Sequence, residues 1–197
     1  MKLNSPELLS MKFKMTKTWY HGTFVDAYNQ IQKDGIDVDY SRKLARKLDF
    51  GPGFYLTSNK EQAERFTSLK QKQLGTGKLA RALPPKQPCV IEYELDMEAL
   101  LKNFIGEYYL EFDSRFADFI AHNRSTINLL HENDFVYGKV ADGTKLNDFT
   151  EPYLNEDISV EEYLNIIWNE RYELDDQLSI HNQKICDILK EIKMYRV

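Results

Sequence analysis

The chain has 197 residues, which is enough for one domain of ordinary size with a proper hydrophobic core. Its hydrophobic content of 42% and charged content of 29% are typical of a soluble globular protein. A net charge of −5 argues against a nucleic-acid binder held by its overall field, and no stretch approaches the length of a membrane span.

The N-terminal segment carries lysines but lacks a continuous apolar block, so it is not a secretory signal. We expect a flexible leader over residues 1–16, in which Met11 or Met15 could be the true start, and a single domain over residues 17–197. Cys89 and Cys186 are far apart and have no partners at metal-ligand spacing. They are expected to be reduced thiols of a cytoplasmic protein.

Periodicity and turn residues predict the elements of the first half of the chain. A strand at Lys17–His21 leads into a helix at Phe24–Lys33, which Asp34-Gly35 ends. Extended chain and a basic loop or short helix then precede a strand at Phe54–Leu56. Ser58 or Asn59 is expected to cap a helix through Leu74, and Gly75–Pro88 reads as a loop.

The second half begins with an alternating strand at Cys89–Leu95. Asp113 is predicted to cap a helix, Asp134–Ala141 to form a strand, and Ser159 to open a helix through a capping box. A short strand at Gln177–His181 and a closing amphipathic helix at Gln183–Ile192 follow. Strands scattered irregularly among helices indicate an α+β fold rather than a doubly wound parallel sheet.

One stretch is conspicuously basic. It lies between Glu64 and Glu92, lacks any acidic residue, and contains Arg65, Lys70, Lys72, Lys78, Arg81 and Lys86. A solvated loop is the favoured interpretation, ahead of a phosphate-binding surface.

Two segments are typical of strands that end at an open edge beside a ligand: Tyr20-His21-Gly22-Thr23, and the run 49–57, Asp-Phe-Gly-Pro-Gly-Phe-Tyr-Leu-Thr. Glycine there lets the backbone approach a bound molecule and adopt torsion angles closed to other residues. These segments, with Ser41, Gln62-Ala63, Asn123-Arg124 and the stretch 176–181, resemble the ADP-ribosyltransferase superfamily over most of the chain, roughly Thr18 to Leu189. The similarity is to the His-Tyr-x branch, which includes diphtheria toxin and the poly-ADP-ribose polymerases.

The resemblance implies a split antiparallel β core with peripheral helices, and NAD as co-substrate. It implies that His21 bonds the adenosine-side ribose, that the backbone of Gly22 holds the nicotinamide amide, and that Tyr55 stacks on the nicotinamide ring. Further contacts to NAD are expected from Thr23, Ser41 and Gly53. From the residues alone, His21 could instead be satisfied by a neighbouring carbonyl. Likewise Phe54 and Tyr55 could simply alternate across a sheet, and Tyr40 is a second candidate ring partner.

Gln177 stands where many relatives carry a catalytic glutamate that stabilises the oxocarbenium-like transition state. Glutamine keeps the hydrogen bond and lacks the charge, which argues against chain-building and leaves single transfer, NAD hydrolysis or binding open. Asp142 could supply the missing charge, whereas Asp176 is expected to face away from Gln177. Asp49 could orient the glycine turn.

Two arginines have open roles. Arg124 could bind the ribose or pyrophosphate, or form a structural ion pair, and Arg42 beside Ser41 is a further candidate for the same ligand groups. The four histidines have no zinc-site spacing, and Gly75-Thr76-Gly77-Lys78 lacks the Ser/Thr of a phosphate-binding loop. No metal site is therefore expected.

The expected function is mono-ADP-ribosyl transfer from NAD to a macromolecular acceptor, protein or nucleic acid. Family resemblance suggests an intracellular toxin or defence effector, which would need a neutralising antitoxin or immunity protein. The alternatives are an inactive NAD- or ADP-ribose-binding module, an NAD glycohydrolase, or a scaffold without NAD affinity.

Overall fold

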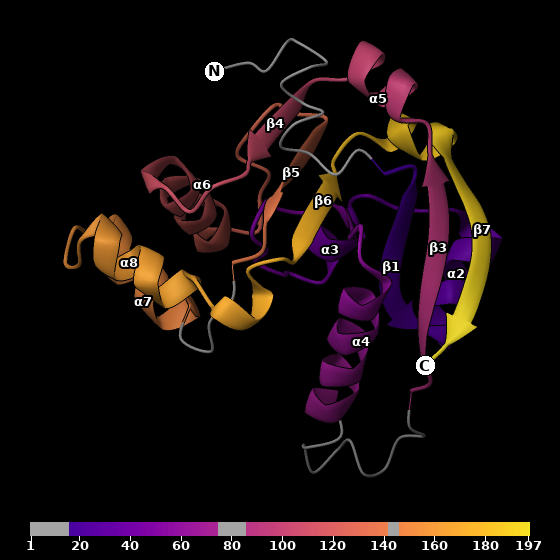
Figure 1. Cartoon of the computed structure of the whole chain (residues 1–197), viewed down its shortest axis with the longest axis horizontal. Helices are drawn as coiled ribbons and strands as arrows, with labels where there is room; N and C mark the ends of the chain where they lie inside the picture. The colour runs from indigo at the N-terminus through magenta and orange to yellow at the C-terminus, as the bar shows by residue number, and fades with distance from the viewer. Residues whose placement is uncertain (1–15, 75–85, 142–145) are drawn as a thin grey trace.

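The computed structural model describes residues 16–74, 86–141 and 146–197, and in this part the chain builds two sheets (Figure 1). The first is three-stranded in the order β1-β3-β7, made of β1 (Thr18–Phe24), β3 (Pro88–Leu95) and β7 (Leu189–Arg196). The second is four-stranded in the order β2-β6-β5-β4, made of β2 (Phe54–Leu56), β6 (Asp176–Ile180), β5 (Phe135–Lys139) and β4 (Gly106–Tyr109).

Every strand pairing is antiparallel except that of β4 with β5, which is parallel. The fold is therefore mixed α and β, with one antiparallel and one mixed sheet, and is compatible with the expected α+β class. Residues 1–15 of the predicted leader, 75–85 of the predicted loop, and Asp142 lie outside the described residues. Among the described residues no helix is long and apolar enough to cross a membrane.

Within the described residues, backbone pairing joins the two sheets at one isolated bridge. Tyr20 of β1 and Thr57, just after β2, exchange backbone hydrogen bonds of 2.8 and 2.9 Å in an isolated bridge. Beyond it, β1 pairs with β3 and β2 pairs with β6, so the two strands separate. We call this point the β1–β2 fork.

Successive side chains of β6 point to opposite faces of the second sheet, and a different hydrophobic cluster covers each face. Leu178 and Ile180 face one hydrophobic cluster with Trp19 of β1 and Tyr93 of β3. The opposite face of the second sheet carries Val136 of β5 into another cluster, built under a helical lobe. That lobe consists of α6 (Ser114–Ser125), α7 (Leu146–Leu154) and α8 (Val160–Ile167).

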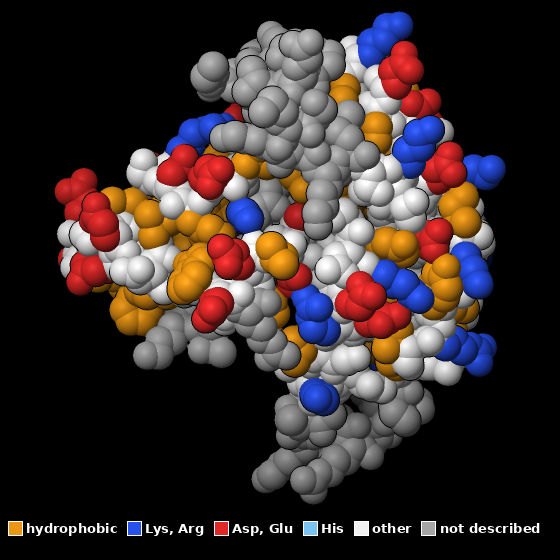
Figure 2. Space-filling model, in the orientation of Figure 1, with side chains coloured by type: hydrophobic (Ala, Val, Ile, Leu, Met, Phe, Trp, Pro, Cys, Tyr) orange, Lys and Arg blue, Asp and Glu red, His pale blue; other side chains and the backbone are white. Residues whose placement is uncertain are grey.

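Acidic side chains gather over the α7–α8 end of this lobe (Figure 2). The exposed carboxylates there are those of Asp148, Glu151, Glu156, Asp157, Glu161 and Glu162. These carboxylates make this end of the lobe negative, which disfavours contact with nucleic-acid phosphates there.

α4 (Lys60–Leu74) packs against β1 at very close range. The Thr67 hydroxyl donates to the Thr23 carbonyl at 2.7 Å. A Cβ atom on Gly22 would lie 2.4 Å from the carbonyl oxygen of Ala63, so no larger residue fits there without moving the helix.

The local capping signals were predicted correctly. Asp113 caps α6 by accepting from the backbone N–H of Phe116, and Ser159 opens α8 with both bonds of a capping box. α8 ends at Ile167, however, and the 3₁₀ turn η2 (Glu170–Tyr172) follows it. The predicted helix after β1 is present as α2 (Val25–Asp34), and the basic segment after it forms the short α3 (Tyr40–Lys43).

The predicted closing helix at Gln183–Ile192 is wrong. This segment forms the 3₁₀ helix η3 (Gln183–Ile188) and then enters β7. The strand is favoured because Lys193 and Lys190 lie opposite Glu92 and Glu94 of β3, and opposite charges across a strand pair are stabilising. Sequence analysis did not predict α5 (Met97–Asn103), β4 or α7.

The carboxylate of Asp176 lies beside the fork and is 8% exposed. It accepts hydrogen bonds from the Ser58 backbone N–H (2.8 Å) and from the hydroxyls of Ser58 (2.5 Å), Thr57 (2.9 Å) and Tyr137 (2.9 Å). The Gln62 side-chain amide, on α4, makes two hydrogen bonds to the backbone of Asp176. Its Nε2 donates to the Asp176 carbonyl at 2.7 Å, and its Oε1 accepts from the Asp176 N–H at 3.2 Å. One residue therefore joins β2, β5, β6 and α4.

Replacing Asp176 with alanine should lower the free energy of unfolding by about 3–5 kcal/mol, because four donors lose a charged acceptor in a buried setting. Urea denaturation would measure this loss. Asp187→Ala, at an exposed carboxylate, is the matched control and should change the free energy by less than about 0.5 kcal/mol. Equal effects of the two variants would contradict a central role for Asp176.

Candidate functional site

The imidazole of His21 occupies the β1–β2 fork. Its Nδ1 lies 2.7 Å from the carbonyl oxygen of Tyr55, and its ring stacks on Phe54 with 4.4 Å between centroids. A carbonyl can only accept, so Nδ1 carries the hydrogen and Nε2 is an acceptor. Burial lowers the pKa of His21 to about 4, which keeps the ring neutral near pH 7.

The Tyr55 ring leaves β2 on the face opposite Phe54, and packs against the cluster under the helical lobe. Its hydroxyl donates to the Gly51 carbonyl at 2.7 Å and accepts from the Phe50 N–H at 3.0 Å. Burial raises its pKa, so the phenol stays protonated. The structure brings His21 to the backbone of Tyr55 and not to its ring, and the ring holds the turn before β2.

Gln177 lies on the same face of the second sheet as the Tyr55 ring, because Tyr55 pairs with Ser179 and side chains repeat every two residues. Its Nε2 donates to Asp49 Oδ2 at 2.8 Å and to the Lys139 carbonyl at 3.0 Å. Both amide hydrogens are thereby used, and Oε1 is the atom that can accept from a ligand.

Asp49 in turn is held by Arg124, whose Nε lies 2.7 Å from Oδ1, and by the Ala141 N–H, 3.3 Å from Oδ2. Arg124 therefore forms the structural ion pair that sequence analysis left open. Asp49, which was expected only to orient the glycine turn, is the carboxylate that contacts Gln177. Asp176 faces away from Gln177, as predicted, since its bonds go to Ser58 and Tyr137.

The remaining predicted binding residues shape the fork. Ser41 Oγ accepts from the Gly53 N–H at 3.0 Å, and a Cβ on Gly53 would lie 2.4 Å from Ser179 Oγ. Gly51 has φ +79°, a left-handed torsion that favours glycine. A partly exposed strip follows both strands of the fork: His21, Gly22 and Thr23 on β1, with Gly53 and Tyr55 on β2.

Two other predicted ligand contacts belong to α3 and not to either strand of the fork. Arg42 is 3.4 Å from Asp39, within its own turn, and Tyr40 is 53% exposed at the start of α3. Neither is brought to His21 or Gln177 by a bond within the described residues.

Lys70 was predicted only as part of a solvated basic run, and its place in the structure is different. Its ammonium lies 4.1 Å from the centroid of the Phe66 ring, and burial lowers its pKa to about 8, with the Arg46 charge as a second cause. The spacing of Ala63, Thr67 and Lys70 on one helical face was the signal that could have identified it.

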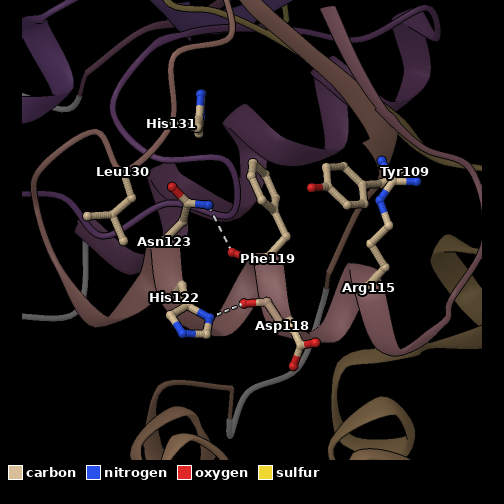
Figure 3. Close-up of a pocket in the computed structure, with 8 residues that line it drawn as sticks. All are labelled: Tyr109, Arg115, Asp118, Phe119, His122, Asn123, Leu130 and His131. Atoms are coloured by element: carbon tan, nitrogen blue, oxygen red, sulfur yellow. Dashed lines mark hydrogen bonds between the residues drawn. The ribbon is translucent and has the colours of Figure 1, made fainter. Parts of the chain in front are cut away.

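A hollow of about 490 Å³ opens beside α6 (Figure 3). Tyr109 and Phe119 stack in its wall at 4.4 Å, and Asn123 donates to the Phe119 carbonyl at 2.8 Å.

His131 donates from Nε2 to the Phe50 carbonyl (3.0 Å), while His181 donates from Nδ1 to the Pro52 carbonyl (2.8 Å). The two imidazoles thus fix the glycine turn from its far side.

A second hollow, of about 320 Å³, is lined by Tyr137, Lys139, Leu174 and Asp176 at the ends of β5 and β6. Neither hollow is lined by His21 or Tyr55. Within residues 16–74, 86–141 and 146–197, no three His, Cys, Asp or Glu side chains gather as metal ligands.

Comparison with family models gives one match, over residues 18–191, to the family described as "Protein of unknown function (DUF3990)". The match covers most of the chain, so the chain belongs to this family. The comparison with curated proteins found no match.

Acid should destabilise the protein through its buried histidines. An unfolded histidine binds a proton below its ordinary pKa of about 6.5, whereas folded His21 does so only below about 4 and His181 below about 3. Between those limits the unfolded state holds more protons. The stability contribution is therefore complete above pH 6.5 and is lost as the pH falls, by about 1–3 kcal/mol for each histidine.

Urea denaturation from pH 7 to pH 4 would measure this loss. In His181→Gln the dependence of unfolding free energy on pH should be shallower than in the parent protein, while the exposed-site control His122→Gln should leave it unchanged. Identical curves for all three proteins would show that His181 is not held neutral by burial.

Proposed function

We propose that this member of the DUF3990 family binds NAD at the β1–β2 fork, cleaves its nicotinamide–ribose bond and transfers ADP-ribose to a macromolecular acceptor. The observation that carries the proposal is the neutral His21 fixed at the point where the strands separate. Its Nδ1–H is committed to the Tyr55 carbonyl at 2.7 Å, so Nε2 is the acceptor for a ribose hydroxyl.

The partly exposed strip along the fork suits the remainder of the ligand. The backbone N–H and carbonyl of Tyr20 point toward β2, so those of Gly22, two residues further along the same strand edge, face the opening of the fork, which fits hydrogen bonding to a carboxamide such as that of nicotinamide. Phe66 on α4 is 48% exposed and adds a ring on the same side as Lys70.

In the proposed reaction, the bond between C1′ and the pyridinium nitrogen breaks, and its electron pair leaves with nicotinamide. C1′ then carries oxocarbenium-like charge until an acceptor nucleophile attacks it and gives up its proton. Gln177 Oε1 would accept from the ribose 2′-hydroxyl and so stabilise that charge. Asp49, 2.8 Å from Gln177 Nε2, polarises the amide and makes Oε1 a stronger acceptor.

This arrangement is weaker than a free carboxylate, since Arg124 neutralises much of the Asp49 charge. We therefore infer single transfer, with NAD hydrolysis in the absence of an acceptor, rather than chain-building. A toxin or defence role in the cytoplasm, an acceptor that is a protein or nucleic acid, and a neutralising partner protein are parts of the same proposal.

The second candidate is an NAD- or ADP-ribose-binding module without catalysis. It is favoured by the commitment of both Gln177 amide hydrogens and of the Tyr55 hydroxyl to the protein's own oxygens. The two candidates differ in whether nicotinamide is released.

The first test is nicotinamide release from NAD by the purified protein. His21→Ala should reduce release by at least about 100-fold, because the ribose loses its positioning contact, whereas His122→Ala on the exposed side of α6 should not. Tyr55→Phe keeps the ring and removes the bond to Gly51, so it tests whether the ring alone suffices. Saturable NAD binding without release would favour the binding module, and absence of both would contradict the proposal.

Gln177→Glu should not restore a faster enzyme by itself. The new carboxylate would lie against Asp49, and the like charges should lower the free energy of unfolding by about 2–4 kcal/mol. Adding Asp49→Asn should recover that loss and raise nicotinamide release above the parent rate. Urea denaturation and release assays on the three proteins would check this, and a stable, faster single variant would show that Asp49 does not oppose a charge at position 177.

A further inference from the structure

Two cations flank the fork, one beside each of its strands. Lys70 comes from α4, beside β1, and Arg46 comes from the loop between α3 and β2. Among the described residues neither is in an ion pair. The cations that are paired belong to Arg42, Lys43, Lys60, Arg65, Lys86, Arg115 and Arg124.

The position of Arg46 follows from backbone bonds that lead to the His21 ring. Its N–H donates to the Ser41 carbonyl at 3.2 Å, and Ser41 Oγ accepts from the Gly53 N–H at 3.0 Å. Gly53 precedes Phe54, on which the His21 ring stacks. Arg46 therefore lies on the β2 side of the fork.

The position of Lys70 follows from α4. Thr67, one turn earlier, is bonded to the Thr23 carbonyl, and Ala63 touches Gly22. The Lys70 stem crosses Phe66, and its ammonium lies 4.1 Å from that ring's centroid. Lys70 therefore lies on the β1 side of the fork, close enough to His21 for its charge to disfavour protonation of the imidazole.

A half-buried ammonium beside a guanidinium is unfavourable unless an anion screens the two charges. Burial and the Arg46 charge both lower the pKa of Lys70, and no acidic group is among the causes of the shift. The protein keeps this repulsive pair at the one point where β1 and β2 separate. An anionic ligand of two or more charges would turn the repulsion into attraction.

We infer that Lys70 and Arg46 form a subsite for the diphosphate of a dinucleotide. The inference rests on the proposed function, since it assigns the anion to the bridge between the two riboses of NAD. Each phosphate carries one negative charge, so one ammonium and one guanidinium match the group. If His21 bonds the adenosine-side ribose, the diphosphate is the next group of NAD along the fork. It would then lie between α4 on the β1 side and the loop after α3 on the β2 side.

The experiment compares ADP-ribose with adenosine, which has no phosphate, by isothermal titration calorimetry. Lys70→Met keeps the apolar stem over Phe66 and removes the charge, and Arg46→Gln keeps a polar side chain. Each should weaken ADP-ribose binding by about 10- to 100-fold and leave adenosine binding unchanged. The matched controls are Lys72→Met, at an exposed lysine on the same helix, and Arg196→Gln, at an exposed arginine on β7, and both should bind like the parent protein.

The outcomes separate this subsite from the proposed reaction. ADP-ribose binding that is lost in Lys70→Met supports the subsite even if the parent protein releases no nicotinamide. Equal ADP-ribose affinity in all variants overturns the subsite, and nicotinamide release would then still support the enzyme. Loss of adenosine and ADP-ribose binding in parallel would assign Lys70 a structural role and overturn the subsite as well. Absence of ADP-ribose binding by the parent protein would overturn the subsite, and nicotinamide release would still decide the proposed reaction.

Discussion

The buried carboxylate of Asp176 holds together the place where the two sheets meet. A charge with little solvent is tolerated only when hydrogen bonds replace its hydration, and here the donors come from the chain after β2 and from β5. The neighbouring Gln62 fixes α4 to the backbone of the same residue. The fork therefore has a defined geometry even though β1 and β2 share a single bridge.

Around that point the structure separates two kinds of electrostatics. On one face, His21 stays neutral while Lys70 and Arg46 make the surroundings positive. On the other face, Gln177, Asp49 and Arg124 form a closed chain of polar contacts with little net charge. In the proposed complex, the negative diphosphate of the dinucleotide would be attracted to the positive face around His21. Its positive nicotinamide ring would meet the face around Gln177, which acts through dipoles and not through net charge.

Local signals in the sequence predicted much of this fold, because capping and alternation act over a few residues. Ser159 and Asp113 identified helix starts for that reason. The failure at 183–192 has a physical cause: Ile185, Ile188, Leu189 and Ile192 are spaced as on a helix, and only the distant β3 offers the strand partners that decide otherwise. Pro152 inside α7 likewise obscured a helix that packing against α6 and α8 supports.

The sequence predicted which motifs contain the candidate site, but not which side chains contact one another there. His21, Tyr55 and Gln177 were singled out from short segments, yet the direction of each side chain depends on tertiary contacts. Asp49 and Gln177 are 128 positions apart, and no local pattern joins them. Alternation with Phe54 sends the ring of Tyr55 toward the helical lobe, but the bond from its hydroxyl to Gly51 is a tertiary detail that the sequence did not predict.

The docking of α4 has a consequence for how the molecule unfolds. The helix is bonded to β1 through Thr67 and to β6 through Gln62, so it crosses the boundary between the two sheets. Without the helix, the two sheets would be joined by one backbone bridge and by the hydrophobic cluster that Trp19 and Tyr93 share with Leu178 and Ile180. With α4 fastened to both, opening either sheet must break the same helix contacts, which makes them one cooperative unit in slow amide hydrogen exchange.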